Sequence, residues 1–165
     1  MFTKILVPLD GSALAEQALG PALALARAVS AEVVLLRSVA TTQPVFALSS
    51  ALSGQFESRV EDSLFANRRQ ATQEYLGSLQ RRYQCPGCVV RAVDEIGEPA
   101  AAIVDVAHER GVDLIVMSTH GETGMRRAVW GSVTERVLHG AGCPVLVVRS
   151  PDPIRRVLIT LDGSE

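Results

Sequence analysis

Residues 118–132 (STHGETGMRRAVWGS) form the segment of this sequence that is best suited to binding an anion. They follow an aliphatic run typical of a buried strand and lead into a helix that we expect to begin at Gly131 and Ser132. A helix N-terminus offers unpaired N–H groups and a partial positive charge, and both favour phosphate. Glycines let the main chain approach phosphate oxygens, although such loops also make plain turns. We predict a phosphate site formed by Ser118, Thr119, Gly121, Gly124, Gly131 and Ser132.

Two further kinds of charged residue could join this site. Asp10 ends the aliphatic run of residues 4–9 (KILVPL), so it would face residues 118–132 if the first and fourth strands were neighbours in a parallel sheet. Its alternative role is that of a turn residue at the entry to a helix. Arg126 and Arg127 could contact the phosphates or could lie in solvent, and the sequence favours neither role.

Strand-like and helix-like patterns alternate along the chain, which predicts an α/β fold with a parallel sheet covered on both faces. We expect strands at residues 4–9, 32–39, 88–94, 113–118 and 144–149. We expect helices at residues 13–29, 55–83, 97 onward and 131–139. Ser12 should cap the first helix, and Pro21 should cause a kink or a tightened turn near Gly20. Pro99 should open the third helix, with Ile103, Val106 and Ala107 facing inward.

The connection over residues 40–54 is long for a compact domain, and such segments are usually mobile or functional. The helix after it carries charges of both signs, which are typical of a solvated outer face. Its apolar residues recur at helical spacing, namely Phe56, Val60, Leu64, Ala71, Tyr75 and Leu79.

Composition narrows the function classes. The 165 residues suit one domain, and with 47% hydrophobic but only 4% aromatic residues its core must be aliphatic. A formal net charge of −2 without a basic block gives no support for a nucleic-acid or membrane partner. No apolar run approaches the ~20 residues of a membrane span, and Met1 leads directly into a strand pattern. We therefore expect a cytoplasmic protein.

Three cysteines, Cys85, Cys88 and Cys143, argue against a secreted disulfide framework. Residues 85–88 (CPGC) have redox-type spacing, but a strand rather than a helix is expected to follow them. We interpret the pair as part of a connecting turn, with a redox or metal site as the alternative.

The chain ends with a repeat of its beginning. Residues 154–164 (IRRVLITLDGS) match residues 2–12 (FTKILVPLDGS) in pattern and share the final LDGS. Internal repeats usually mark duplicated units. We therefore expect a domain at residues 1–149, a linker at 150–153 and the first strand of a truncated second repeat at 154–165, with a chance extra strand as the alternative.

Over residues 2–149 the sequence resembles the universal stress protein family. The resemblance rests on the opening KILVPLDGS, on the strand at residues 114–117 followed by STHG, on GSVTERVL and on CPVLVV. The nucleotide-binding branch of that family carries a motif of three glycines. Two residues separate the first glycine from the second, nine residues separate the second from the third, and the third is followed by serine or threonine. Gly121, Gly131 and Ser132 match this pattern, whereas Ser118 stands where the first glycine is expected.

The resemblance implies a doubly wound, Rossmann-like sheet of five parallel strands in the order 3-2-1-4-5. It implies that the ligand is ATP, with ADP or AMP as alternatives and Mg²⁺ as an accompanying ion. Asp10 would hold the ribose hydroxyls or the adenine edge, and Ser12 would belong to the same binding site. The backbone near Ser38 and Val39 would read the adenine. The edge strand at residues 144–149 would form a homodimer.

The leading hypothesis is an ATP-binding regulatory module of the stress response, with slow ATP hydrolysis at most, because no activated nucleophile or tuned acid–base pair is evident. The first alternative is a dimeric interaction protein of the same fold that binds no nucleotide, an option that Ser118 leaves open. ATP pyrophosphatases and adenylyl transferases need an SGGxDS-like loop or a HIGH-type motif, and the sequence has neither. A phosphoacceptor receiver domain needs several carboxylates at the first strand end, where the sequence has Asp10.

Overall fold

The protein, described here as a computed structural model, contains one sheet of five parallel strands. The description covers residues 2–40, 54–84, 87, 89–119 and 131–149, without the side chains of residues 54–61. The strands, in chain order, are β1 Lys4–Pro8, β2 Glu32–Val39, β3 Val90–Ile96, β4 Leu114–Ser118 and β5 Val145–Val148. Their order across the sheet is β3-β2-β1-β4-β5, and every pair is parallel. The predicted fold class and strand order are confirmed.

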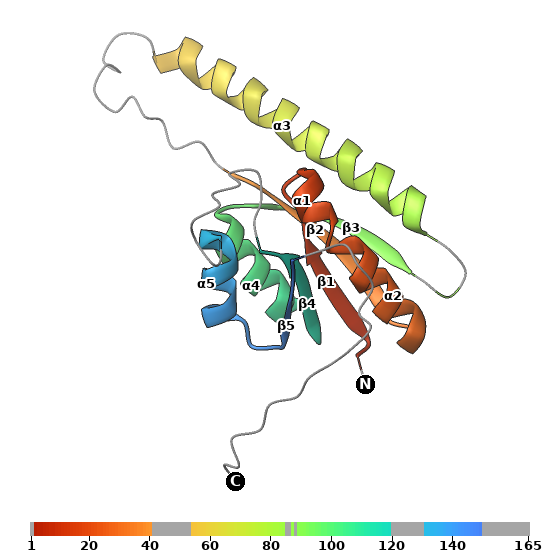
Figure 1. The fold of residues 1–165 in the computed structure, drawn as a ribbon. Helices are drawn as coiled ribbons and strands as arrows, with labels where there is room; N and C mark the ends of the chain where they lie inside the picture. The colour runs from red at the N-terminus through yellow and green to blue at the C-terminus, as the bar shows by residue number, and fades with distance from the viewer. Residues whose placement is uncertain (1, 41–53, 85–86, 88, 120–130, 150–165) are drawn as a thin grey trace.

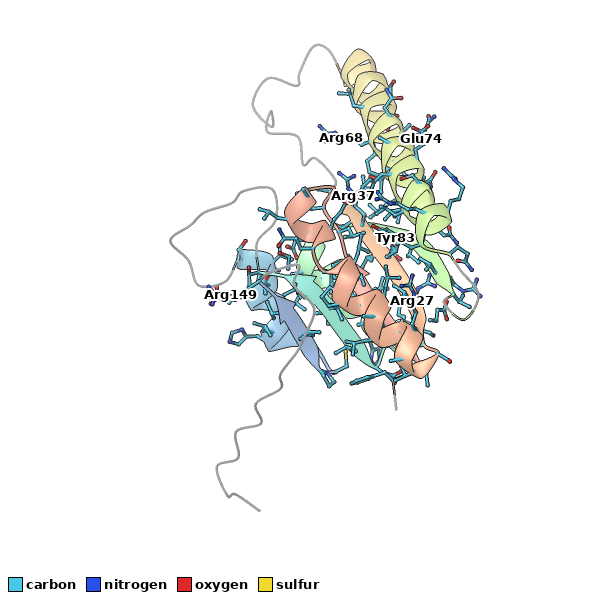
Figure 2. All side chains as sticks on the ribbon, turned by 45° about the vertical axis from the view of Figure 1, so that its right-hand side comes forward. Arg27, Arg37, Arg68, Glu74, Tyr83 and Arg149 are labelled. Carbon is cyan, nitrogen blue, oxygen red and sulfur yellow. The ribbon has the colours of Figure 1, made fainter. Side chains whose placement is uncertain are left out.

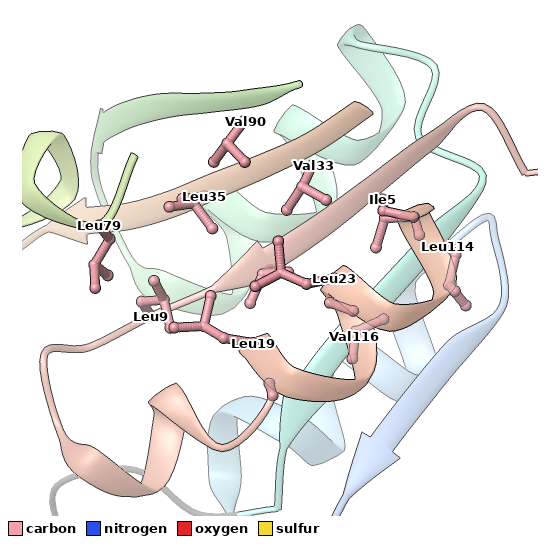
Figure 3. Close-up of a cluster of buried hydrophobic side chains, with 14 of the residues drawn as sticks. Ile5, Leu9, Leu19, Leu23, Val33, Leu35, Leu79, Val90, Leu114 and Val116 are labelled. Carbon is pink, nitrogen blue, oxygen red and sulfur yellow. The ribbon is translucent and has the colours of Figure 1, made fainter. Parts of the chain in front are cut away.

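Helices cover both faces of this sheet (Figure 1). One face carries α1 (Ala13–Glu16), α2 (Leu19–Val29) and α3 (Gly54–Tyr83), and the other carries α4 (Pro99–Glu109) and α5 (Ser132–Gly140). Alternate residues of each strand point to opposite faces: Ile5 and Val7 of β1 join the core under α1 and α2, while Leu6 joins the core under α4. Figure 3 shows the first of these cores, in which aliphatic side chains from both strands and helices meet.

The first predicted helix is interrupted close to the expected position. We expected a kink or a tightened turn near Gly20, and α1 ends at Glu16 while α2 begins at Leu19. The physical reason is that the ring of Pro21 clashes with the carbonyl of the residue four positions earlier, Gln17. The chain therefore tightens just before that point, and the N–H of Gln17 bonds to the carbonyl of Leu14 at 3.2 Å, three residues back.

The boundaries of β3 also differ from the prediction, which was residues 88–94. The strand runs from Val90 to Ile96 because it pairs with β2 from Val33, which lies opposite Val90, to Val39, which lies opposite Ile96. A local sequence pattern contains no information on this register. Pro99 does open α4, whose Ile103, Val106 and Ala107 are buried as predicted.

The long helix α3 packs on the sheet through its C-terminal half. Its buried side chains are Thr72, Leu76 and Leu79, whereas Leu64 of the predicted apolar stripe is 51% exposed. Figure 1 shows the N-terminal half of α3 projecting past the sheet, which accounts for the exposure of Leu64. Among the described residues, no helix is both long and apolar enough to cross a membrane.

An ion pair fixes α3 to the edge strand. Arg69 Nε donates to Asp94 Oδ2 of β3 at 2.7 Å, and Gln73 Nε2 reaches the same carboxylate at 3.2 Å. Partial burial would by itself raise the pKa of Asp94, but the hydrogen bonds from Arg69 and Gln73 outweigh burial and lower it. The helix is thus held at β3 and projects freely beyond it.

Candidate functional site

A cleft of about 410 Å³ lies at the carboxyl ends of the strands. It is centred where the strand order reverses between β1 and β4, which is the usual ligand position in open parallel sheets. Its floor is apolar and its rim is polar, a combination typical of small-molecule sites. The lining comprises Pro8, Leu9, Asp10, Ala15, Leu36, Arg37, Ser38, Ala40, Pro99, Ile103, Met117, Ser118, Gly131, Ser132, Val133 and Thr134.

The start of α5 is tied to the end of β4. The Gly131 N–H donates to the Thr119 carbonyl at 2.8 Å, and the hydroxyl of the buried Thr134 donates to the Ser118 carbonyl at 3.1 Å. Gly131 is the N-cap and has no side chain with which to cover the first turn. The first N–H groups of a helix lack intrahelical acceptors, so this end of the cleft provides donors for an anion.

Ser118 lies at the end of β4 and lines the cleft as predicted. It pairs with Val148 of β5, and among the described residues Ser30 is the one non-glycine residue with a positive φ. Ser118 thus has a φ that any L residue adopts, and the backbone at this position does not require glycine. Compared with glycine, Ser118 therefore affects a ligand only through the space that its side chain occupies in the cleft.

Asp10 faces the same cleft from the end of β1, so the structure brings it together with Ser118, Gly131 and Ser132 as the topology predicted. Its Oδ1 also accepts the Ser12 N–H at 2.8 Å, which is the local turn role that we considered as the alternative. Both roles are compatible, because a carboxylate has two oxygens. Ser12 is not among the described lining residues, and its Oγ accepts the Ala15 N–H at 3.1 Å as the predicted cap of α1.

The other predicted site residues divide into three groups. Ser38 lines the cleft at the end of β2. Val39 and Thr119 are buried and act through their backbones: the Val39 carbonyl accepts the Gly97 N–H at 3.1 Å, and the Thr119 N–H donates to the Val148 carbonyl at 3.1 Å. The remaining three lie outside the described residues, namely Gly121, Gly124 and Arg126.

Arg37 is the charged lining residue that sequence reasoning missed. It follows four aliphatic residues of β2 and precedes Ser38, and an arginine at the end of a buried strand was the available signal. Within the described lining, Arg37 and Asp10 are the two charged side chains. In the part of the chain that the structure describes, no cluster of three or more metal-binding side chains is present. The cleft can therefore bind a polar ligand but shows no metal cage of its own.

An ion pair connects the two helices that border the cleft. Arg136 of α5 reaches Glu98, the N-cap of α4, at 2.8 Å, and Glu98 also accepts the Ala101 N–H at 3.0 Å. Slight burial opposes a charged carboxyl, but bonds from backbone N–H groups and from Arg136 lower the pKa of Glu98 overall. The two helix starts that border the cleft are therefore joined to each other.

Comparison with known proteins gives one consistent result. The model of the universal stress protein family matches residues 1–149. A universal stress protein of Methanocaldococcus jannaschii is 34% identical over 92% of this chain and 84% of its own length. The solved structure of UspA from Lactobacillus plantarum has a TM-score of 0.75 at 26% identity, covering 90% of this chain and 98% of that one. A family protein from Arabidopsis thaliana, solved with AMP bound, has a TM-score of 0.57 at 16% identity, covering 90% and 92%.

Proposed function

The chain belongs to the universal stress protein family, and from this premise we propose that it is an ATP-binding regulatory module of the stress response with at most slow ATP hydrolysis. The observation that carries the proposal is the cleft between Asp10 and the start of α5. It provides an anion-binding end and a carboxylate in one cavity, and a nucleotide needs both.

The phosphate end of the proposed site is the first turn of α5. Its N–H groups and the Ser132 hydroxyl would donate to phosphate oxygens, and Gly131 leaves room for them. The hydrogen bond from Gly131 to the Thr119 carbonyl and that from Thr134 to the Ser118 carbonyl hold this turn against β4. The donors are thereby fixed in place before a ligand arrives, which lowers the entropic cost of binding.

The nucleoside end would lie toward β1 and β2. Two strand spacings, about 10 Å, separate β4 from β2 across β1, close to the length of a nucleoside monophosphate. Asp10 would accept hydrogen bonds from ribose hydroxyls, and Leu36, Ile103 and Met117 form an apolar surface for the base. The cleft volume of about 410 Å³ lies within the range of small-molecule sites.

The AMP bound to the Arabidopsis protein supports an adenine nucleotide as the ligand class for this fold. Mg²⁺, if it accompanies ATP, would be held by phosphate oxygens with Asp10 as the nearest described carboxylate of the cleft.

Two assembly features belong to the same proposal. β5 is an edge strand of the sheet, and Val145, Leu146 and Val147 are only partly buried, so a second copy could pair there. Residues 154–165 would be the first strand of a second repeat that takes the place of that copy in a tandem protein.

Calorimetric titration with ATP and Mg²⁺ tests the proposal. Ser132→Ala removes a donor from the phosphate end and should weaken ATP binding about tenfold, the usual effect of a hydrogen bond to a charged group. Ser63→Ala is the matched control, because it removes the same hydroxyl from a serine that is exposed on α3 and does not line the cleft. ATP should also raise the melting temperature, since it binds only the folded chain.

The alternative is a protein of the same fold that binds no nucleotide, and Ser118 in place of glycine is the observation that favours it. If millimolar ATP with Mg²⁺ gives neither a heat of binding nor a shift of the melting temperature, the alternative holds and the proposal is refuted.

A further inference from the structure

Arg37 sits between the cleft and the long helix α3. It extends from the C-terminal end of β2 and lines the cleft beside Ser38. Figure 2 shows its side chain between α1 and α3. Its position makes it a candidate for contact with whatever occupies the nucleoside end.

The guanidinium of Arg37 is held between two surfaces. On one side lies Gly11, where a Cβ would be 2.9 Å from Nη1 and 3.1 Å from Cζ. On the other side lies the ring of Tyr75 on α3, whose centroid is 5.2 Å from Cζ. Gly11 has a φ of +93°, so the backbone conformation favours glycine there and also leaves the space that the guanidinium fills.

Tyr75 is itself fixed in place. Its hydroxyl donates to Glu16 Oε1 of α1 at 2.9 Å. Burial raises the pKa of Tyr75, and the bond to Glu16 raises it further, so the phenol stays neutral and keeps this bond. The Tyr75 ring therefore forms a stable platform for the guanidinium.

Among the described residues, the Arg37 side chain takes part in no ion pair. The ion pairs there join Arg69 to Asp94, Arg91 to Glu32 and Arg136 to Glu98. Within the same residues its guanidinium, which carries five N–H donors, makes no hydrogen bond either. A cation that is oriented by a ring and a glycine, and that borders a cleft, is suited to bind a ligand.

We propose that Arg37 is a nucleotide-binding residue that donates to acceptor atoms of the nucleoside, with Tyr75 as its positioning residue. This inference rests on the proposed function. Arg37 lies on β2, two strands from the donors of α5 above β4, so it contacts the base or ribose rather than the phosphates. Lysine could replace its charge but not its flat fork, which is what the Tyr75 ring and Gly11 orient.

The test compares two ligands, ATP and inorganic triphosphate, which lacks a nucleoside. Arg37→Met should weaken ATP binding about tenfold and leave triphosphate binding within about twofold of the wild type. Arg37→Lys should recover only part of the ATP affinity. Ser132→Ala, at the phosphate end, should weaken both ligands and thus serves as the contrasting variant.

The positioning role of Tyr75 has its own matched pair. Tyr75→Phe keeps the ring and should retain the preference for ATP over triphosphate, whereas Tyr75→Leu removes the ring and should reduce that preference. A purely structural role would change the melting temperature of Tyr75→Leu but leave the preference unchanged.

Two results would overturn the inference while leaving the proposed function intact. One is ATP binding by Arg37→Met within twofold of the wild type in a variant shown to be folded by circular dichroism. The other is an equal loss of affinity for ATP and for triphosphate in Arg37→Met, which would mean that Arg37 attracts both ligands through its charge alone. Failure of the wild type to bind any ATP would refute the proposed function and the inference together.

Discussion

Replacing Thr134 with valine tests whether the hydrogen bond between α5 and β4 positions the start of that helix. Thr134 is 3% exposed, and its hydroxyl donates to the Ser118 carbonyl at 3.1 Å and approaches the Thr119 carbonyl at 3.4 Å. Valine has nearly the same shape but no hydroxyl, so the change removes the donor without opening a cavity.

The magnitude follows from which carbonyl loses its partner. The Thr119 carbonyl keeps the Gly131 N–H at 2.8 Å, so the Ser118 carbonyl bears the loss. One net hydrogen bond contributes about 1 kcal/mol, and a carbonyl left without a partner costs about 1–3 kcal/mol. Since Ser118 is only half-buried and water can partly replace the donor, we expect a loss of about 1–2 kcal/mol in the free energy of unfolding.

Urea denaturation of three variants provides the assay. Thr134→Val should lower the midpoint without changing the slope, and its melting temperature should fall by about 3–6 °C. Thr134→Ser keeps the hydroxyl and should lose only about 0.8 kcal/mol for its missing methyl group. Thr134→Ala removes both groups and should lose more than either. A valine variant as stable as the wild type would refute the reasoning.

Three further predictions concern the cleft and its border. Ser118→Gly should lower the free energy of unfolding by about 0.5–1 kcal/mol in urea titrations, because glycine loses more backbone entropy in a strand. A variant that is as stable as the wild type to both urea and heat would contradict the account of Ser118. Gly11→Ala should lower both the melting temperature and the affinity for ATP, because its φ of +93° is strained for alanine and the Cβ meets Arg37; an unchanged affinity would mean that the guanidinium moves aside without effect. In a Tyr83→Phe background, phenolate absorbance should report a pKa of Tyr75 above its ordinary value of about 10. Because that pKa is raised on folding, the contribution to stability is complete below pH ~10 and is lost as the pH rises above it; a midpoint at or below 10 would contradict the burial and the bond to Glu16.

Local patterns in the sequence were enough to predict the fold. Aliphatic runs and helical periodicity depend on nearest neighbours, so the five strands, the helix that Pro99 opens and the cap at Ser12 could be placed in advance. The elements follow from the period of a pattern and the handedness of a connection. The strand order, which makes β1 and β4 neighbours and brings Asp10 and Ser118 to one cleft, was implied by the family resemblance.

Contacts between distant segments were beyond that reasoning. Tyr75 stacks on Arg37 and bonds to Glu16, residues 38 and 59 positions away in the chain, because the C-terminal half of α3 happens to pack over β2 and β3. The register of β3 and the exposure of Leu64 depend on the same docking. No periodicity encodes where one element lies against another.

The residues of the candidate site also fall into those that the sequence indicated and one that only the tertiary structure revealed. Gly131, Ser132 and Asp10 could be found from the sequence because helix starts and strand ends have recognisable residues. The sequence signal for Arg37, an arginine at the end of a buried strand, was weak, since such a side chain is usually solvated. The role proposed for it depends on space that Gly11 leaves empty and on a ring from another element. Residue types thus indicate which groups can bind a ligand, and packing across the sheet determines which of them face it.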